Sequence, residues 1–308
     1  MLETLGVVLP VFGLILLGGL ARWRGVLGPH AVSELNRFVV WLALPAMLFS
    51  IMAKASLATL WQPGFVAAFG LGSLLLFCVT VAMRRGVLAE AGLDGLNAAY
   101  PNTGYMGFPL AAAALGPASL PLMTMATILT VCFVFAFGVI CIEIGQQAGQ
   151  SPWRLARRVG LALVRNPMLV APALGAMASA AGISLPGSLD RFLALLGAAA
   201  SPCALVALGA FLAQARGGRR TAWGAVAWLT GLKLVALPVL VWLLAAPLLQ
   251  LPVLQVQAAV LAAALPTGTG PFMLAEYYRR DAGTTSATIL ASTVLSVLTV
   301  AAYLAWAR

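Results

Sequence analysis

The chain has 308 residues; 62% of them are hydrophobic and only 8% are charged, and the mean hydropathy is +1.01. Soluble domains have about 25% charged residues, so this chain has too few charges to cover a water-facing surface. The composition excludes a soluble enzyme, a nucleic-acid-binding module and a disordered protein, and it indicates a polytopic membrane protein.

Ten apolar runs follow one another along the chain, each long enough to cross a hydrocarbon layer of ~30 Å as a helix. Pro and Gly residues interrupt the fourth and the ninth. A polar connection at residues 145–165 separates a first five-helix half, residues 1–144, from a second half, residues 166–308. We expect the membrane-spanning helices at residues 4–21, 37–53, 63–83, 93–115, 119–143, 166–182, 190–213, 221–247, 253–278 and 284–306.

The basic residues lie mainly in the loops on one side of these predicted spans. Of the 18 Lys and Arg residues, 14 lie in loops that follow odd-numbered spans, 3 lie on the opposite side, and Lys233 lies within a span. Lys and Arg mark cytoplasmic loops, so we expect both termini on the periplasmic or extracellular side of the cell inner membrane. The basic residues behind the net charge of +10 therefore orient the protein in the membrane, and we expect no nucleic-acid partner.

An odd number of spans in each half requires the second half to enter the membrane upside down relative to the first. Two proline-containing segments recur: residues 44–48 resemble residues 201–205, and residues 99–104 align with residues 264–269. Inverted repeats whose helices are interrupted at matching places point to the binding site of a secondary transporter. The alternative is a chance match, because proline is common in membrane helices.

The interruptions of the fourth and ninth spans define the candidate substrate site. Pro removes a backbone donor and Gly permits non-helical geometry, so both spans should unwind near the middle of the membrane. The second half of each span then starts there as a helix N-terminus, which favours an anion such as a carboxylate. In the alternative interpretation, the Asn and Thr side chains only cap the broken backbone. The candidate substrate-binding residues are Pro101, Asn102, Thr103, Gly104, Pro266, Thr267, Gly268, Thr269 and Gly270.

Lys233 is the one basic residue deep within a predicted span, ~18 Å from its start at 1.5 Å per residue. An ionisable group at that depth is a functional candidate. It could hold the substrate anion, carry a coupling proton or compensate charge. Whether H⁺, Na⁺ or neither ion drives transport stays open.

The sequence offers no ligand set for a metal and no catalytic pair. His30 is the single histidine, and the acidic residues lie at span ends or in loops. Glu276 precedes Arg279 and Arg280 by three and four positions, a spacing typical of a helical ion pair. We therefore expect no enzyme activity, no metal and no cofactor.

Several segments of the chain, in order, resemble the auxin efflux carrier family. Residues 102–110 (Asn-Thr-Gly-Tyr-Met-Gly-Phe-Pro-Leu) are similar to the fourth-span motif of that family. Residues 266–276 look like its bacterial branch, which is often assigned to malonate or malate transport. Further similar segments are residues 44–46, 165–167, 233–238, 274–277 and 292–296.

The resemblance implies an all-α membrane fold that is shared with the plant PIN carriers and the bile-acid sodium symporters. That fold has ten transmembrane helices in two inverted five-helix repeats, with helices 4 and 9 broken and crossing at the midplane. Spans 1, 2, 6 and 7 form a scaffold that dimerises, and spans 3–5 and 8–10 form a transport domain that moves as an elevator. Asn102 falls where the polar residue of the family's crossover lies, and Lys233 could occupy the place of a sodium ion in a related carrier.

These observations predict a secondary active or facilitative transporter of small organic anions, either carboxylates like malonate and malate or weak acids like auxin. The expected partners are the substrate, the lipid bilayer and a second copy of the chain, bound through the scaffold helices. The alternatives are a passive anion channel and a membrane sensor without transport activity.

Overall fold

The computed structural model describes residues 2–54, 62–84, 86–146, 164–214 and 222–306, together with residues 153, 157, 160 and 161. Most of the polar connection at residues 145–165 lies outside these described residues. Within them, all regular secondary structure is helical apart from one isolated antiparallel bridge. The prediction of an all-α protein is therefore confirmed for this part of the chain.

The helices of the first half include several wide π-helical turns, η1, η2, η3 and η5, and one 3₁₀ turn, η4. Pro117 and Pro121 lie in first turns, where a missing N–H costs little. Gly116, with φ +79°, separates α8 from η4. The elements are α1 Leu2–Trp23, α2 Ala31–Phe38, η1 Val39–Ala43, α3 Leu44–Lys54, α5 Pro63–Phe65, η2 Val66–Leu71, α6 Gly72–Met83, α7 Leu88–Ala99, η3 Thr103–Gly107, α8 Phe108–Leu115, η4 Pro117–Ser119, α9 Leu120–Ile128, η5 Leu129–Val134 and α10 Phe135–Gly145.

The second half begins where the Asn166 side chain accepts a hydrogen bond from the Met168 amide at 3.0 Å, and Pro167 opens the helix. This is a regular N-cap. The elements are α12 Pro167–Ala180, α13 Gly187–Ala198, α14 Ala200–Gln214, α15 Trp223–Gly231, η6 Leu232–Ala236, α16 Leu237–Leu243, η7 Leu244–Leu248, α17 Val253–Ala264, α18 Gly270–Tyr277 and α19 Gly283–Trp306.

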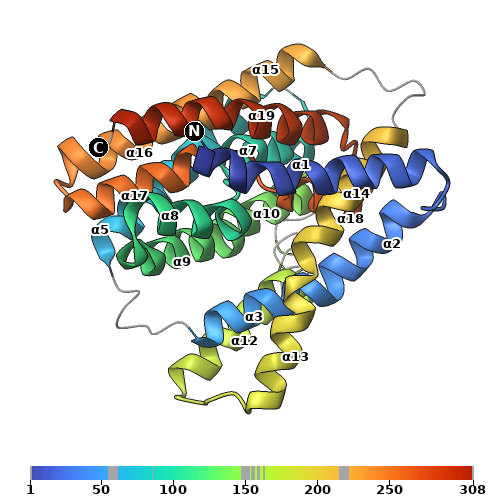
Figure 1. The fold of residues 1–308 in the computed structure, drawn as a ribbon, viewed down its shortest axis with the longest axis horizontal. Helices are drawn as coiled ribbons and strands as arrows, with labels where there is room; N and C mark the ends of the chain where they lie inside the picture. The colour runs from blue at the N-terminus through green and yellow to red at the C-terminus, as the bar shows by residue number, and fades with distance from the viewer. Residues whose placement is uncertain are drawn as a thin grey trace.

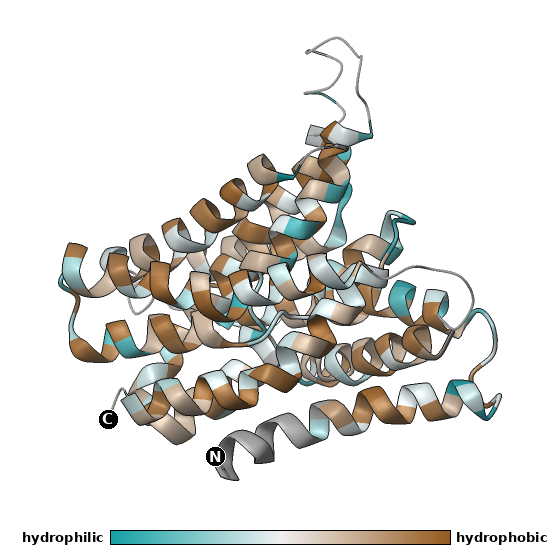
Figure 2. Cartoon of the chain, turned by 90° about the horizontal axis from the view of Figure 1, so that it is seen from above, coloured by the Kyte–Doolittle hydropathy of each residue, from teal (hydrophilic) through white to brown (hydrophobic). Residues whose placement is uncertain are grey.

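Six helices of the described residues are long and apolar enough to cross a membrane. Figure 2 shows hydrophobic residues along most of the helix lengths and hydrophilic residues mainly in loops and at helix ends. Shorter apolar helices lie at Phe12–Trp23, Pro167–Ala180 and Val253–Ala264. The chain is thus a multi-pass membrane protein, whereas the count of ten spans stays a prediction. The six long helices are Ala31–Lys54, Pro63–Met83, Pro117–Gly145, Gly187–Ala213, Trp223–Leu248 and Gly283–Trp306.

The helices pack in two groups (Figure 1). In the first helix group, α1 packs along α14, α14 contacts α2, and α12 and α13 pack on α3. In the second helix group, α7 lies between α6 and α10, α17 contacts α16, α9 and α19, and α15 packs on α19. Fewer contacts join the groups, among them those of α1 with α19 and of α18 with α2. Both helices that the sequence predicts to be broken belong to the second group.

Candidate functional site

Both predicted interruptions are present. Helix α7 ends at Ala99 and η3 starts at Thr103, while α17 ends at Ala264 and α18 starts at Gly270. Tyr100 and Leu265, which follow the first halves, leave helical geometry with ψ 84° and 152°. Each is followed by a proline, which disfavours helical geometry in the preceding residue and offers no backbone donor. Pro101 and Pro266 therefore lie where the helices stop.

The two breaks pair with each other. Pro101 and Thr267 face one another in the isolated antiparallel bridge. On either side of it, the Asn102 amide donates to Pro266 O at 2.8 Å, and the Gly268 amide donates to Tyr100 O at 2.9 Å. Backbone groups that are freed from a helix in a membrane must be satisfied within the protein. The two breaks cross, and the backbone groups of each one form hydrogen bonds with the backbone of the other.

A buried polar network fixes the second break. The Thr267 amide donates to Ser292 Oγ at 3.1 Å, and Thr267 Oγ1 donates to Asn97 O at 2.8 Å. Asn97 Nδ2 in turn donates to Thr285 Oγ1 at 3.0 Å. Thr267 is fully buried, so its side chain holds the crossing together. Our sequence analysis missed Asn97, Thr285 and Ser292 as parts of this network; Ser and Thr recurring three or four positions apart along α19 are the signal for Thr285 and Ser292.

The residues at the starts of the second half-helices keep their polar groups available. Asn102 is the N-cap of η3 and Thr269 is the N-cap of α18, and neither side chain makes a capping hydrogen bond. Their exposed fractions are 6% and 7%. Next to them, Thr103 Oγ1 is buried without a hydrogen-bond partner among the described residues. None of these three side chains thus caps the broken backbone through a hydrogen bond in the described part of the chain.

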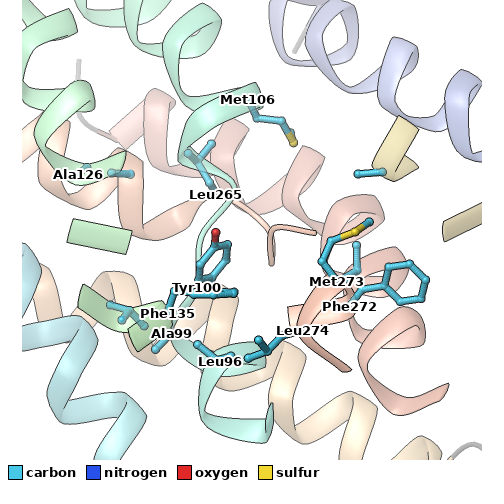
Figure 3. Close-up of a cluster of buried hydrophobic side chains, with 14 of the residues drawn as sticks. Leu96, Ala99, Tyr100, Met106, Ala126, Phe135, Leu265, Phe272, Met273 and Leu274 are labelled. Atoms are coloured by element: carbon cyan, nitrogen blue, oxygen red, sulfur yellow. The ribbon is translucent and has the colours of Figure 1, made fainter. Parts of the chain in front are cut away.

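The Tyr100 ring covers the α17–α18 break. A Cβ atom at Gly268 would lie 3.0 Å from Tyr100 Cε1, and one at Gly270 would lie 2.5 Å from Tyr100 Cζ, so the ring needs glycine at both places. Figure 3 shows this ring at the centre of the crossing, among apolar side chains that include Leu265 and Phe135. At Gly104 the nearest atom to an added Cβ is Thr127 Cγ2, 3.9 Å away. An added Cβ would thus make an ordinary van der Waals contact at Gly104, whereas it would press on the Tyr100 ring at Gly268 and Gly270.

Lys233 lies beside the second break and not in it. Its Nζ donates to Ala263 O at 2.6 Å, and the side chain is fully buried. Ala263 lies in the last turn of α17, where carbonyl groups have no partner in their own helix and carry partial negative charge. Lys233 therefore supplies a donor to a carbonyl group at the C-terminus of this half-helix.

No cluster of acidic or metal-binding side chains accompanies the crossing. Among the described residues, no group of three or more His, Cys, Asp or Glu side chains is placed to hold a metal ion. Asp94, in the middle of α7, pairs at 2.7 Å with Arg84, which follows the end of α6. Among the described residues, the polar features at the crossing are the helix termini, the Asn and Thr side chains and Lys233 beside them.

Comparisons with known proteins find membrane transporters. The model of a family described as "Membrane transport protein" matches residues 4–304. A Rhizobium meliloti protein named "Putative malonate transporter" is 36% identical over 97% of this chain and 94% of its own length. An "Uncharacterized transporter" of Methanothermobacter thermautotrophicus is 28% identical over 94% of each chain. The "Uncharacterized transporter YfdV" of Escherichia coli is 24% identical over 96% of this chain and 95% of its own.

Proposed function

We propose that this chain, which belongs to the membrane transport protein family of the auxin efflux carriers, carries small carboxylates across the cell inner membrane. The family and the names of the relatives indicate a transporter rather than an enzyme. The substrate class rests on the crossing of the two broken helices. Malonate is the first substrate to test, because the relative with 36% identity bears that name.

The observation that carries the proposal is the bridge between Pro101 and Thr267, which brings the starts of η3 and α18 together. Two helix N-termini at one point present partial positive charge, which suits a carboxylate. Asn102, Thr103 and Thr269 add side-chain donors: Asn102 and Thr269 make no capping hydrogen bond, and Thr103 Oγ1 has no partner among the described residues. A neutral site of this kind binds an anion without an arginine.

For the mechanism, we propose ten spans in two inverted repeats, with the first helix group as a dimerising scaffold and the second as a moving transport unit. The packing supports this division, because the contacts within each group are far more extensive than those between the groups. The antiparallel direction of the bridge also fits two repeats of opposite orientation. In this mechanism the crossing travels with the second group, as an elevator.

For Lys233 we propose charge compensation. Its contact with Ala263 O provides a fixed cation at the C-terminus of α17, on the opposite side of the break from the α18 N-terminus. Flux measured in Na⁺-free medium and over a range of pH tests whether a further ion is coupled. A strict requirement for Na⁺ would show that this fixed cation is not sufficient.

The proposal is tested by reconstituting the purified protein in liposomes and measuring uptake of labelled malonate, malate and indole-acetate. We expect saturable uptake of at least one small dicarboxylate, with accelerated exchange when unlabelled substrate is present on the other side. A passive channel would give uptake without counterflow. Absence of protein-dependent uptake of any carboxylate would contradict the proposal.

Substitution of Asn102 by Ala should raise the KM for the transported carboxylate about tenfold, because one hydrogen bond to a charged ligand is lost. Folding should be unaffected, since the Asn102 side chain makes no capping bond. Thr80→Val is the matched control: Thr80 is also buried, but its hydroxyl donates to Leu76 O within α6, away from the crossing. Equal kinetics in Asn102→Ala and the parent protein would move the site elsewhere.

A further inference from the structure

We propose a second carboxylate site in the pocket between α2 and α18, at the end of the molecule that the arginine count predicts to be cytoplasmic. One wall consists of Ser33, Asn36, Arg37 and Trp41, and the other of Glu276, Tyr277 and Arg279. We call it the α2–α18 pocket. The proposal rests on the proposed function, since it assigns an entry site for the same class of substrate.

The size and lining of this pocket suit a small anion. Its volume is about 350 Å³, within the usual range of about 300–1,000 Å³ for small-molecule sites. Most of the lining side chains are polar, whereas the three other cavities described for this structure have largely apolar walls. The aromatic rings of Trp41 and Tyr277 lie with their centroids 6.3 Å apart across the two walls.

Two arginines from different helices provide the positive charge. Arg37 lies in the last turn of α2, and Arg279 follows the end of α18. With Glu276 as the acidic group of the lining, the two arginines leave a formal charge of +1. Glu34 also contacts Arg37, at 3.6 Å, but both side chains are about two-thirds exposed, at 70% and 67%, so this pair is weak and exchangeable. Two planar guanidinium groups on facing walls match the two carboxylates of a dicarboxylate.

Asn36 provides independent evidence for a ligand. It is 3% exposed, and its one hydrogen bond among the described residues is a long contact of 3.4 Å from Nδ2 to Met273 O. Its Oδ1 has no partner in the described part of the chain. Buried polar atoms are almost always hydrogen-bonded, so an unused amide in a pocket wall indicates a missing partner. Oδ1 can only accept a hydrogen bond, whereas Nδ2, whose contact with Met273 O is long, is the atom that can donate to a carboxylate.

Arg279 has an unusual backbone. Its φ of +53° lies in the left-handed region, which a non-glycine residue rarely adopts. Hydrogen bonds from the Arg279 amide to Glu276 O, at 3.1 Å, and from the Arg280 amide to Ala275 O, at 2.7 Å, hold this turn. Strained residues persist where the surrounding structure fixes them, often at binding sites. Here the turn ends α18 and places Arg279 in the wall of the pocket.

The location of the pocket connects it to the crossing. Glu276 lies seven residues after Thr269, which is ~10 Å along α18 at 1.5 Å per residue. One wall belongs to the first helix group and the other to the second. A movement of one group past the other would therefore open or close the pocket. We infer that it collects the carboxylate from the cytoplasm before the substrate reaches Asn102.

The test is protection of a cysteine at position 33 from a membrane-impermeant maleimide in the reconstituted full-length chain. Ser33→Cys places the thiol in the exposed pocket wall, and peptide mass spectrometry reads position 33 separately from the native cysteines. Saturating malonate should slow the labelling, whereas sulfate at equal ionic strength should not. Combining Ser33→Cys with Arg37→Gln or Arg279→Asn should raise the half-protecting malonate concentration about tenfold, because each removes one charge-assisted hydrogen bond. Arg279→Asn uses a residue that tolerates the left-handed region.

Two further variants separate this site from the crossing. Asn102→Ala should keep the protection, because the α2–α18 pocket does not include Asn102. Arg24→Gln is the matched control; Arg24 lies on the same side but stacks on Trp23, 5.3 Å from the ring centre, and should not change protection. Loss of protection in Asn102→Ala, equal protection by sulfate, or no protection at all would each overturn the second site. If malonate gives no protection but is still taken up saturably by the liposomes, the second site fails while the proposed function holds.

Discussion

Asn102 and Thr269 occupy equivalent positions, each as the N-cap of a half-helix that starts at the crossing. Asn and Thr are preferred N-caps because their oxygen accepts from an amide of the first turn. Here neither side chain does so. The two side chains are therefore not used as caps, which is why the proposed site is concentrated at these two residues.

The contact between Lys233 and Ala263 yields a prediction for a single residue. Lys233→Met keeps most of the side-chain volume but leaves Ala263 O buried without a donor. We expect a loss of stability of about 1–3 kcal/mol, seen as a lower Tm in detergent by scanning fluorimetry. Lys54→Met is the control, because Lys54 is half-exposed in its pair with Asp190 and should change stability by less than ~1 kcal/mol. Equal Tm shifts in the two variants would show that Lys233 does not stabilise α17.

The residues that break the two helices were predictable, because the backbone itself carries the signal. Pro101, Pro266 and the adjacent glycines indicate breaks from their covalent structure alone. The partners of a break are a different matter, because Ser292 and Asn97 are far from Thr267 in the sequence and become neighbours only in the packed structure. The sequence analysis also treated Thr267 as a substrate residue, whereas its hydrogen bonds in the structure are used by the fold.

At the scale of elements, small residues determine how closely helices approach. Between α1 and α14, a Cβ at Gly18 would collide with Val206 O, and one at Gly209 would collide with Ile15 O. Helices in a membrane associate through such close backbone contact, because lipid gives them no hydrophobic driving force. The close contact between α1 and α14 is therefore the place to test how the first helix group packs.

Gly209→Ala should push α1 and α14 apart and lower stability by about 1–3 kcal/mol, as overpacking does in other tight interiors. Gly224→Ala, in α15, is the matched control, since an added Cβ meets no atom within 4 Å. Ala is the better helix former, so this control should be neutral or slightly stabilising. The test compares the Tm values of the two variants in the same detergent. An unchanged Tm in Gly209→Ala would contradict the close approach of α1 and α14.

Helix locations were largely predictable, because long apolar runs need no tertiary information. The long helices Ala31–Lys54 and Gly187–Ala213 begin before the predicted spans at 37–53 and 190–213, since α2 and α13 start with polar turns that hydropathy does not detect. The π-helical turns were not predicted; one of them, η6, contains Lys233. A π turn adds one residue without a proline or glycine to mark it, so sequence periodicity does not show it.

At the scale of the whole molecule, the two helix groups must move relative to each other if the elevator mechanism holds. Trp41 and Tyr277 lie across the groups, with ring centroids 6.3 Å apart. Trp242 and Trp306 lie within the second group, at a similar 6.2 Å. Cross-linking the first pair would join the two helix groups, whereas cross-linking the second pair would join two helices of the same group.

Joining Trp41→Cys to Tyr277→Cys with a short bifunctional thiosulfonate should stop malonate flux, and a reductant should restore it. The same reagent on Trp242→Cys with Trp306→Cys should leave flux unchanged, as should treatment of the parent chain, which controls for the native cysteines. Flux that continues after complete linkage of positions 41 and 277 would contradict movement between the groups.

The most direct test of the account is a structure determined by electron cryomicroscopy with malonate bound. The account predicts ligand density at the crossing, with carboxylate oxygens about 3 Å from Asn102 Nδ2 and from first-turn amides of η3 and α18. Density bound only elsewhere, with Asn102 and Thr269 sealed by apolar side chains at saturating malonate, would contradict it.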